Sequence, residues 1–276
     1  SDNERLKFFK EWGKYRAERE YLAFDITSIS SYSKMLEMLE PGYNRDGEDL
    51  PQINMGMLFG ETSMLPIFYN LYQGSIKDVK TLSNMLKYAE HLNLSKVRFV
   101  MDKGFYSDKN VNEMLEKRIK FTIAVPFTAG YAKTLVDSAR KNITSPANSF
   151  MINGDLIHFD SKVMSKKGKR LYASVYYNER HYIDAKEALL KNIILFEDKL
   201  KNMNENSYNE SEYAKYLIVR NSKKGIIIHR NEEIINEALK YKGYVVIISN
   251  EKNEPHEVLR IYRAKDSVER AFDNLK

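Results

Sequence analysis

Short apolar runs of strand length recur along the first half of the chain, and amphipathic or turn-rich segments separate them. The expected strands are residues 21–27, 53–59, 64–72, 96–101 and 121–126. Apolar residues at helical spacing predict a helix over residues 78–92, and the pair Ser107-Asp108 predicts the start of another helix. The order of three strands, a helix, a strand, a helix and a strand predicts an α/β fold with a mixed sheet flanked by helices.

The pattern is less regular after residue 127. We expect strands at residues 150–163, 170–177, 216–219, 225–229 and 243–249, and helices at residues 184–203, 232–241 and from 255 onward. Residues 202–212 are rich in Asn, Ser and Glu, which predicts a loop. Residues 3–20 are highly charged with interspersed aromatic side chains, which is typical of a helix that packs one side on the body or of a linker.

Composition narrows the classes of function. The 276 residues are 43% hydrophobic, enough for a packed core, and the net charge of +6 points weakly to an acidic partner such as nucleic acid. The chain has no cysteine, so any metal must be held by oxygen or imidazole ligands. The absence of cysteine also fits a reducing cytosol. No apolar run has the length of a membrane span, and the first residues lack the basic-then-apolar order of a secretory signal. The missing initial Met and the unfinished last helix lead us to expect a fragment of a longer protein.

Two aspartates share one kind of position, because Asp25 and Asp102 each close or nearly close a short apolar strand. Neighbouring strand ends can bring two such carboxylates close enough to share a divalent ion, and hard oxygen ligands suit Mg²⁺. Two such ions can clamp the attacking and leaving oxygens of a phosphoryl transfer. The alternative for either aspartate alone is a turn former or a helix cap.

Glu269 is the third candidate acid. At 100° per residue, one narrow stripe of the last helix contains Tyr262, Lys265, Glu269 and Lys276, beside an apolar stripe that would dock the helix on the sheet. A carboxylate on this stripe could reach the aspartates, and the flanking cations and phenol suit a phosphate backbone. The alternative is a solvated helix face with a Lys265–Glu269 ion pair.

Other kinds of site find little support. The five histidines are scattered without the spacing of a zinc site, and the chain has neither a nucleophile elbow nor a phosphate-binding glycine loop. Short basic clusters at residues 166–170 and 223–224 are either solvated turns or points of DNA contact.

Three segments resemble the motifs of one large group of bacterial insertion-sequence DDE transposases. Asp25-Ile26-Thr27 resembles the first motif, D-x-T, and residues 101–107 resemble the second-aspartate motif, D-x-G-[FY]-[YS]-S. Residues 261–276 resemble the signature Y-x2-R-x3-E-x6-K, although Lys265 stands where the family usually has Arg. Weaker matches lie at residues 49–52, 74–78 and 243–250, and all of them follow the order of the family.

The resemblance implies a ribonuclease-H-like core, an α/β mixed sheet flanked by helices, which is interrupted by a mixed α/β, strand-rich insertion before the glutamate. On this plan we expect four parts. They are residues 1–20 as an N-terminal helical segment or linker, 21–126 as the first part of the core, 127–240 as the insertion, and 241–276 as the last strand and a truncated catalytic helix.

The resemblance also implies an activity. In the family, the three acids (here Asp25, Asp102 and Glu269) bind two Mg²⁺ or Mn²⁺ ions and cleave and transfer DNA strands. Tyr262, Lys265 and Lys276 would hold phosphates near the transposon end. We therefore expect double-stranded DNA as partner, both transposon ends and target, a homodimer in the synaptic complex, and a bacterial, nucleoid-associated protein of the cytoplasm.

Two other functions stay open from the sequence. One is a remnant that still binds DNA but no longer cuts it. The other is a ribonuclease-H-like, metal-dependent nuclease that cleaves without strand transfer. Lysine at position 265 keeps the charge of arginine but lacks the planar guanidinium that binds phosphate in a bidentate manner. DNA-end binding is therefore expected to be weaker or altered.

Overall fold

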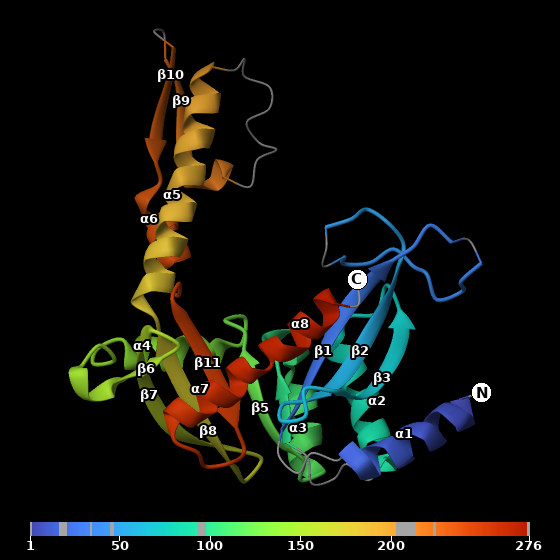
Figure 1. Cartoon of the computed structure of the whole chain (residues 1–276). Coiled ribbons are helices and arrows are strands. Elements are labelled where there is room, and N and C mark those ends of the chain that lie inside the picture. The colour runs from blue at the N-terminus through green and yellow to red at the C-terminus, as the bar shows by residue number, and fades with distance from the viewer. Residues whose placement is uncertain are drawn as a thin grey trace. The chain divides into compact units, whose positions relative to one another are not determined.

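The computed structural model of the chain (Figure 1) describes residues 2–16, 21–33, 35–44, 47–92, 98–202, 213–222 and 225–274. It divides into two compact units. Unit 1 comprises Ser1–Ala132, Ser161–Ser174 and Val246–Lys276, and unit 2 comprises Lys133–Asp160 and Val175–Val245.

Unit 1 is built on a mixed sheet with the strand order β3-β2-β1-β4-β5-β11. These strands are β1 (Tyr21–Ser30), β2 (Gln52–Gly60), β3 (Pro66–Gln73), β4 (Arg98–Met101), β5 (Lys120–Val125) and β11 (Tyr244–Ser249). Strands β1, β4 and β5 are parallel, β2 runs antiparallel to β1 and β3, and β11 runs antiparallel to β5. Parts of β8 (Lys169–Tyr177) and β7 (Asp155–Lys166) continue the sheet within residues 161–174.

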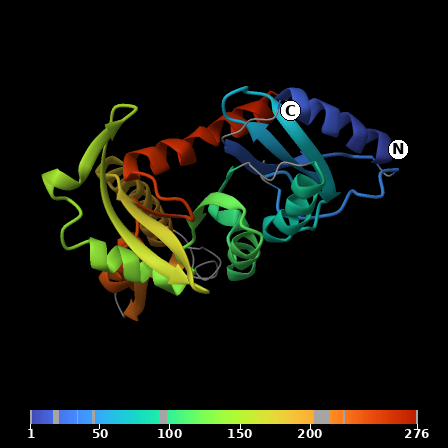
Figure 2. The same cartoon turned by 90° about the horizontal axis from the view of Figure 1, so that it is seen from below.

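The helices of unit 1 follow local sequence signals. They are α1 (Asp2–Arg16), α2 (Asp78–His91), the 3-10 turn η1 (Lys103–Phe105), α3 (Asp108–Glu116), α7 (Pro255–Ala264) and α8 (Asp266–Asp273). Helix α2 buries one apolar face, and the hydroxyl of Ser107 caps α3 by accepting a hydrogen bond from the amide of Asn110. Helix α1 lies against β3 (Figure 2), where Phe9 packs on Phe68.

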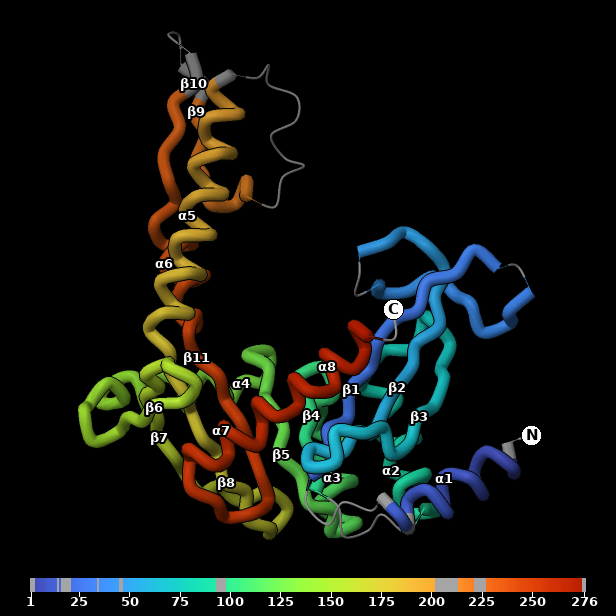
Figure 3. The backbone as a smooth tube through the Cα atoms, in the orientation of Figure 1, coloured from blue at the N-terminus to red at the C-terminus, as the bar shows by residue number. Residues whose placement is uncertain are grey.

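Helices α7 and α8 cover one face of the sheet. Val268 and Phe272 of α8 pack with Ala23 of β1 and with apolar residues of β2, so that α8 lies beside β1 (Figure 3). Ile261 of α7 packs on Tyr21 and on Val100 of β4. Side chains alternate between the two faces of a strand, so this face of β1 also carries Asp25, two residues after Ala23.

Unit 2 has its own elements and core. They are α4 (Gly130–Ala139), the 3-10 turns η2 (Pro146–Asn148) and η4 (Ala214–Tyr216), β6 (Ser149–Ile152), α5 (Glu179–Asn202), β9 (Leu217–Ser222), β10 (Gly225–Arg230) and α6 (Glu232–Leu239). Strand β6 pairs with β7, and β9 pairs with β10 as a separate two-stranded sheet. Ile193 of α5, Leu217 of β9 and Ile235 of α6 form the centre of the apolar core.

The α/β class, the mixed sheet flanked by helices and the order of the first seven elements are confirmed. Several local expectations are wrong. Strand β1 continues to Ser30, residues 150–163 form two strands joined at Asn153-Gly154 rather than one, and α4 was not predicted. Both residues of that turn have positive φ, which suits a tight hairpin. Most of the expected loop at residues 202–212 lies outside the described residues.

Within the described part of the chain, no helix is both long enough and apolar enough to cross a membrane.

Candidate active site at the edge of β1 and β4

Sheet register places the two predicted aspartates side by side. The parallel pairing of β1 with β4 ends at Phe24 opposite Met101. The next residues in the chain are Asp25, still within β1, and Asp102, directly after the end of β4. Adjacent strands are about 4.8 Å apart. Asp25 and Asp102 each follow by two residues a side chain, Ala23 or Val100, that packs against α8 or α7. Because side chains two residues apart share a face, both carboxylates lie on the side of the sheet that these helices cover.

The two aspartates take different local positions. Asp25 lies inside β1 and not in a turn, and its Oδ1 accepts a hydrogen bond from the amide of Ile26 at 2.8 Å. Asp102 precedes η1 in the cap position, but its side chain makes no cap hydrogen bond. It binds the phenol of Tyr262 instead, with the Tyr262 hydroxyl donating to Asp102 Oδ1 at 2.6 Å.

Helix α8 brings the third acid to the same place. Its buried residues Val268 and Phe272 pack the helix on β1 and β2. Glu269 follows Val268 and is exposed. One cavity of about 310 Å³ is lined by all three predicted acids. The full lining is Asp25, Ile26, Thr27, Asp78, Asp102, Gly104, Phe105, Glu269, Phe272 and Asp273.

The predicted last helix is broken at Lys265, which joins α7 to α8. The Lys265 ammonium donates to Glu269 Oε1 at 2.6 Å, lies 3.6 Å from Asp266 Oδ1, and sits over the ring of Tyr262 at 5.6 Å. The solvated Lys265–Glu269 pair considered from the sequence is therefore present, but the lysine side chain is only 12% exposed. Lys265 itself keeps helical backbone angles, φ −56° and ψ −25°, so its bond to Glu269 has the i, i+4 spacing of a continuous helix.

Charges around the cavity act on Lys265 and Tyr262. Burial is the largest influence on Lys265 and by itself lowers the pKa. The hydrogen bond to Glu269 and the charges of Asp102 and Asp25 outweigh it, so the pKa of Lys265 is raised. Burial raises the pKa of Tyr262 far above its usual value, and the neighbouring Asp102 carboxylate raises it further. Both groups are thus protonated donors at neutral pH.

Two acids of the cavity were not among the predicted site residues. Asp78 is the first residue of α2, and Asp273 lies one helical turn after Glu269. A signal for Asp78 was present, because it closes the 74–78 segment that resembles the family. The predicted phosphate ligand Lys276 lies outside the described residues.

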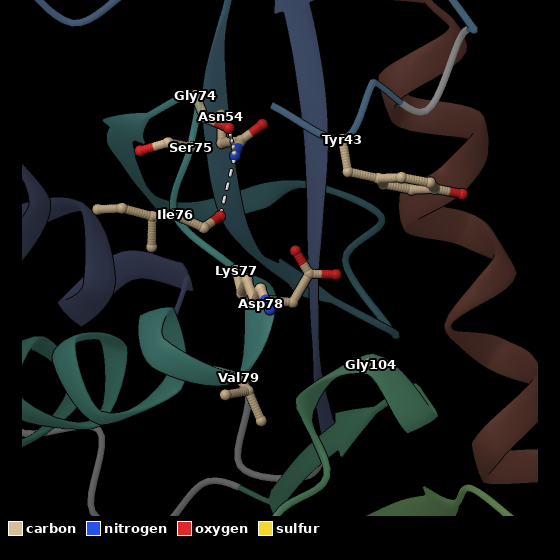
Figure 4. A pocket seen from close by; sticks show the side chains of 9 residues that line it. All are labelled: Tyr43, Asn54, Gly74, Ser75, Ile76, Lys77, Asp78, Val79 and Gly104. Atoms are coloured by element: carbon tan, nitrogen blue, oxygen red, sulfur yellow. Dashed lines mark hydrogen bonds between the residues drawn. The ribbon is translucent and has the colours of Figure 1, made fainter. Parts of the chain in front are cut away.

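A second cavity, of about 390 Å³, adjoins the first and shares Asp78 and Gly104 with it (Figure 4). The side chain of Asn54 forms part of its wall and is fully engaged. Its Nδ2 donates to the carbonyls of Gly74 and Ile76 at 3.1 and 3.2 Å. These bonds hold the turn between β3 and α2.

The donor set of the first cavity is chemically suited to a hard divalent cation, because it consists of carboxylates with no sulfur or imidazole. In the arrangement shown, no three Asp, Glu or His side chains of the described residues are close enough together to hold one ion. The Lys265 ammonium bound to Glu269 supplies positive charge where a cation would otherwise approach that carboxylate.

Comparison with known proteins gives similarities to transposases in sequence and in structure. A family model described as transposase DDE domain matches residues 16–276. Among solved structures, a piggyBac transposase in a synaptic complex with hairpin DNA is similar with a TM-score of 0.46 and 10% identity, over 94% of this chain. The present chain spans 40% of that protein. No curated protein sequence matches significantly.

Proposed function

This chain belongs to the family of transposase DDE domains, and we propose that it cuts and joins DNA strands at the ends of an insertion sequence during DNA recombination. One observation carries the proposal. Asp25, Asp102 and Glu269, which come from three separate parts of the sequence, line a single cavity. Carboxylates gathered in this way are the ligands that a phosphoryl-transfer enzyme needs for Mg²⁺ or Mn²⁺.

We assign the metal-binding role to Asp25, Asp102 and Glu269, which would hold one or two ions. When bound, the metal lowers the pKa of water or of a hydroxyl group and polarises the scissile phosphate. Asp25 and Asp102 are held by the sheet, whereas Glu269 is carried by a short helix. Glu269 therefore has to exchange the ammonium of Lys265 for the metal before the set is complete.

We assign phosphate binding to Tyr262 and Lys265. Each now donates a hydrogen bond to an acid of the cavity, so each is already directed at the place where a scissile phosphate would lie. A DNA phosphate can replace the carboxylate as the partner of Lys265, and this exchange frees Glu269. Lysine offers a single point of charge here, where arginine would bind two phosphate oxygens at once.

The partners follow from this activity. We propose that the enzyme binds double-stranded DNA at transposon ends and at a target, acts as a homodimer in the synaptic complex, and works in the bacterial cytoplasm. The net charge of +6 agrees with a polyanionic partner.

The test is a cleavage and strand-transfer assay with the full-length protein, DNA carrying the ends of its element, and Mn²⁺ or Mg²⁺. We expect cleavage and joining by the wild type and neither by Asp102→Asn, because the substitution keeps the shape but removes the charge. Asp108→Asn is the matched control, since Asp108 lies on α3 and does not line the cavity.

The outcomes separate the competing functions. Absence of cleavage by the wild type with Mn²⁺ contradicts both a transposase and a nuclease, and with retained DNA binding it indicates an inactive remnant. Metal-dependent cleavage without joining indicates a ribonuclease-H-like nuclease.

A further inference from the structure

An exposed tyrosine stands at the cavity that adjoins the proposed active site. Tyr43 lines this cavity of about 390 Å³, and its side chain is 82% exposed. Figure 4 shows its ring clear of the other labelled side chains. Within the part of the chain that the structure describes, the side chain has no hydrogen-bond, ring or ion partner. The ring can therefore pack against a ligand of this cavity.

Buried contacts hold the backbone of Tyr43 in place. Gln52 of β2 is fully buried and donates from Nε2 to the carbonyl oxygens of Tyr43 at 2.8 Å and of Gly74 at 3.2 Å. The buried Ser28 hydroxyl of β1 donates to the same carbonyl of Tyr43 at 3.5 Å. A Cβ atom at Gly42 would lie 2.0 Å from the carbonyl oxygen of Gly74, so glycine lets the two backbones touch. The position of Tyr43 relative to the sheet is thus set by buried groups.

A single exposed tyrosine has an ordinary explanation, because isolated apolar side chains are common on protein surfaces. Tyr15 and Tyr32 are equally exposed, at 83% and 84%, but neither lines this cavity or the one that contains the three acids. Tyr43 differs in two respects. Its backbone is anchored, and its cavity shares Asp78 and Gly104 with the candidate active site.

The rest of the lining suits a nucleotide. Lys77 is the cation of the lining, and its exposed side chain has no hydrogen-bond or ion partner within the described residues. Pockets for small ligands have volumes of about 300–1,000 Å³, so 390 Å³ is enough for one nucleotide. An aromatic ring stacks on any base, and lysine binds phosphate. The Asp78 carboxylate disfavours a phosphate at its own end of the cavity, so we expect the phosphate at the Lys77 ammonium.

We propose that this cavity binds one nucleotide of the DNA strand next to the scissile phosphate, with its base stacked on Tyr43 and its phosphate paired with Lys77. The proposal rests on the proposed function, because a strand whose scissile phosphate lies among the three acids places its next nucleotide in the adjoining cavity. Stacking and charge contacts of this kind hold a strand without reading its sequence.

The test is a double-mutant cycle between Tyr43 and the base. Fluorescence anisotropy in EDTA measures the affinity of the full-length protein for DNA carrying the ends of its element, either intact or lacking the base on one or the other side of the scissile phosphate. We expect Tyr43→Ala to weaken binding of intact DNA roughly tenfold. Loss of the base at one of the two positions should weaken wild-type binding by a similar factor. It should not weaken Tyr43→Ala further, because ring and base act as a pair.

Matched variants separate stacking from other effects. Tyr43→Phe keeps the ring, and Tyr15→Ala removes an equally exposed tyrosine elsewhere, so both should bind within about twofold of the wild type. Lys77→Gln should weaken binding and reduce the slope of log affinity against log salt concentration by about one, as expected for one phosphate contact. Lys87→Gln, an exposed lysine on the same helix that does not line the cavity, should leave the slope unchanged. Circular dichroism checks the fold of each variant.

The proposal is overturned if folded Tyr43→Ala binds intact DNA as tightly as the wild type, or if loss of the base weakens both proteins equally. If Tyr43→Ala does not fold, an unchanged salt slope for Lys77→Gln overturns it instead.

Failure of this proposal is distinct from failure of the proposed function. If the wild type cuts and joins DNA but Tyr43 and the base are not coupled, only the nucleotide site is wrong. If they are coupled but the wild type cuts no DNA with Mn²⁺, the nucleotide site stands and the proposed activity is wrong. If the wild type binds no DNA, both are wrong.

Discussion

Replacing Lys265 by methionine should change stability and metal affinity in opposite directions. Methionine keeps an unbranched side chain of similar length but removes the ammonium that binds Glu269 at 2.6 Å. The carboxylates of Asp25 and Asp102 also act on this ammonium. Without it, the acids of the cavity repel one another in the metal-free protein, and a divalent cation meets no competing charge.

The size of the effect follows from the geometry. Two unit charges about 4 Å apart attract by about 4 kcal/mol at the effective dielectric near a protein surface. The Lys265 side chain is 12% exposed but that of Glu269 is 54% exposed, so solvent screening reduces the net loss to about 1–2 kcal/mol. In the wild type a bound cation has to replace this ammonium, whereas in Lys265→Met it does not. The metal affinity of the variant should therefore be higher by a factor of about 5–30.

Two assays read the two effects. Thermal unfolding in EDTA should show a lower Tm for Lys265→Met, by about 2–4 °C for each kcal/mol in a domain of this size, and Mg²⁺ should raise its Tm more than that of the wild type. Titration with Mn²⁺ should give tighter binding. DNA cleavage should nevertheless fall, because the proposed phosphate contact is lost.

Lys103→Met is the matched control, because Lys103 is an exposed lysine beside Asp102 in sequence and does not line the cavity. It should leave both Tm and Mn²⁺ affinity nearly unchanged. Unaltered or weaker Mn²⁺ binding by Lys265→Met would refute the reasoning, since it would mean that the ammonium does not compete with a cation for these acids.

Three further predictions concern stability. Tyr262→Phe removes the donor to Asp102 at 2.6 Å and should lower the free energy of unfolding by about 1.5–3 kcal/mol, measured with urea, because the lost bond is to a charged group. Phe272→Ala should cost about 3 kcal/mol and increase amide exchange throughout α8, because this ring docks the helix on the sheet; exchange confined to the terminal residue would contradict it. The hydrogen bond from Lys201 lowers the pKa of Glu197 against the opposing effect of burial, so the stabilisation is present above the unfolded carboxyl pKa of about 4.3 and is lost as pH falls through the folded pKa. Glu197→Gln should therefore lower Tm at pH 7 but not at pH 3, and an equal deficit at both values would count against the ion pair.

Local sequence pattern was sufficient for most elements of unit 1. Helix α2 and the hairpin of β2 and β3 were expected because apolar periodicity and turn residues act over a few neighbouring positions. The same reasoning failed at Lys265, where neither glycine nor proline marks the break between α7 and α8. Docking of Ile261 on β4 and of Phe272 near β2 binds the two segments to separate places on the sheet, and periodicity contains no information on that.

The candidate site residues were named from the sequence on grounds other than the periodicity that predicted the elements. Asp25 and Asp102 were singled out by their strand positions, and Glu269 by its helix stripe and by resemblance to a family. None of these arguments gives a distance, and none distinguished Asp78 as part of the site. Asp78 reaches the cavity because Asn54 anchors the preceding turn and Gly104 leaves room, which are contacts between residues far apart in the chain.

By itself, the sequence determined the α/β class, the order of the core elements and the kinds of group available for chemistry, which are carboxylates, lysines and tyrosines without any cysteine. These properties depend on composition and on short-range periodicity. The tertiary structure decided which carboxylates share a cavity and where the ammonium of Lys265 lies. Such relations arise from parallel register between β1 and β4 and from helix docking, because electrostatic interactions depend on distance in space and not on separation along the chain.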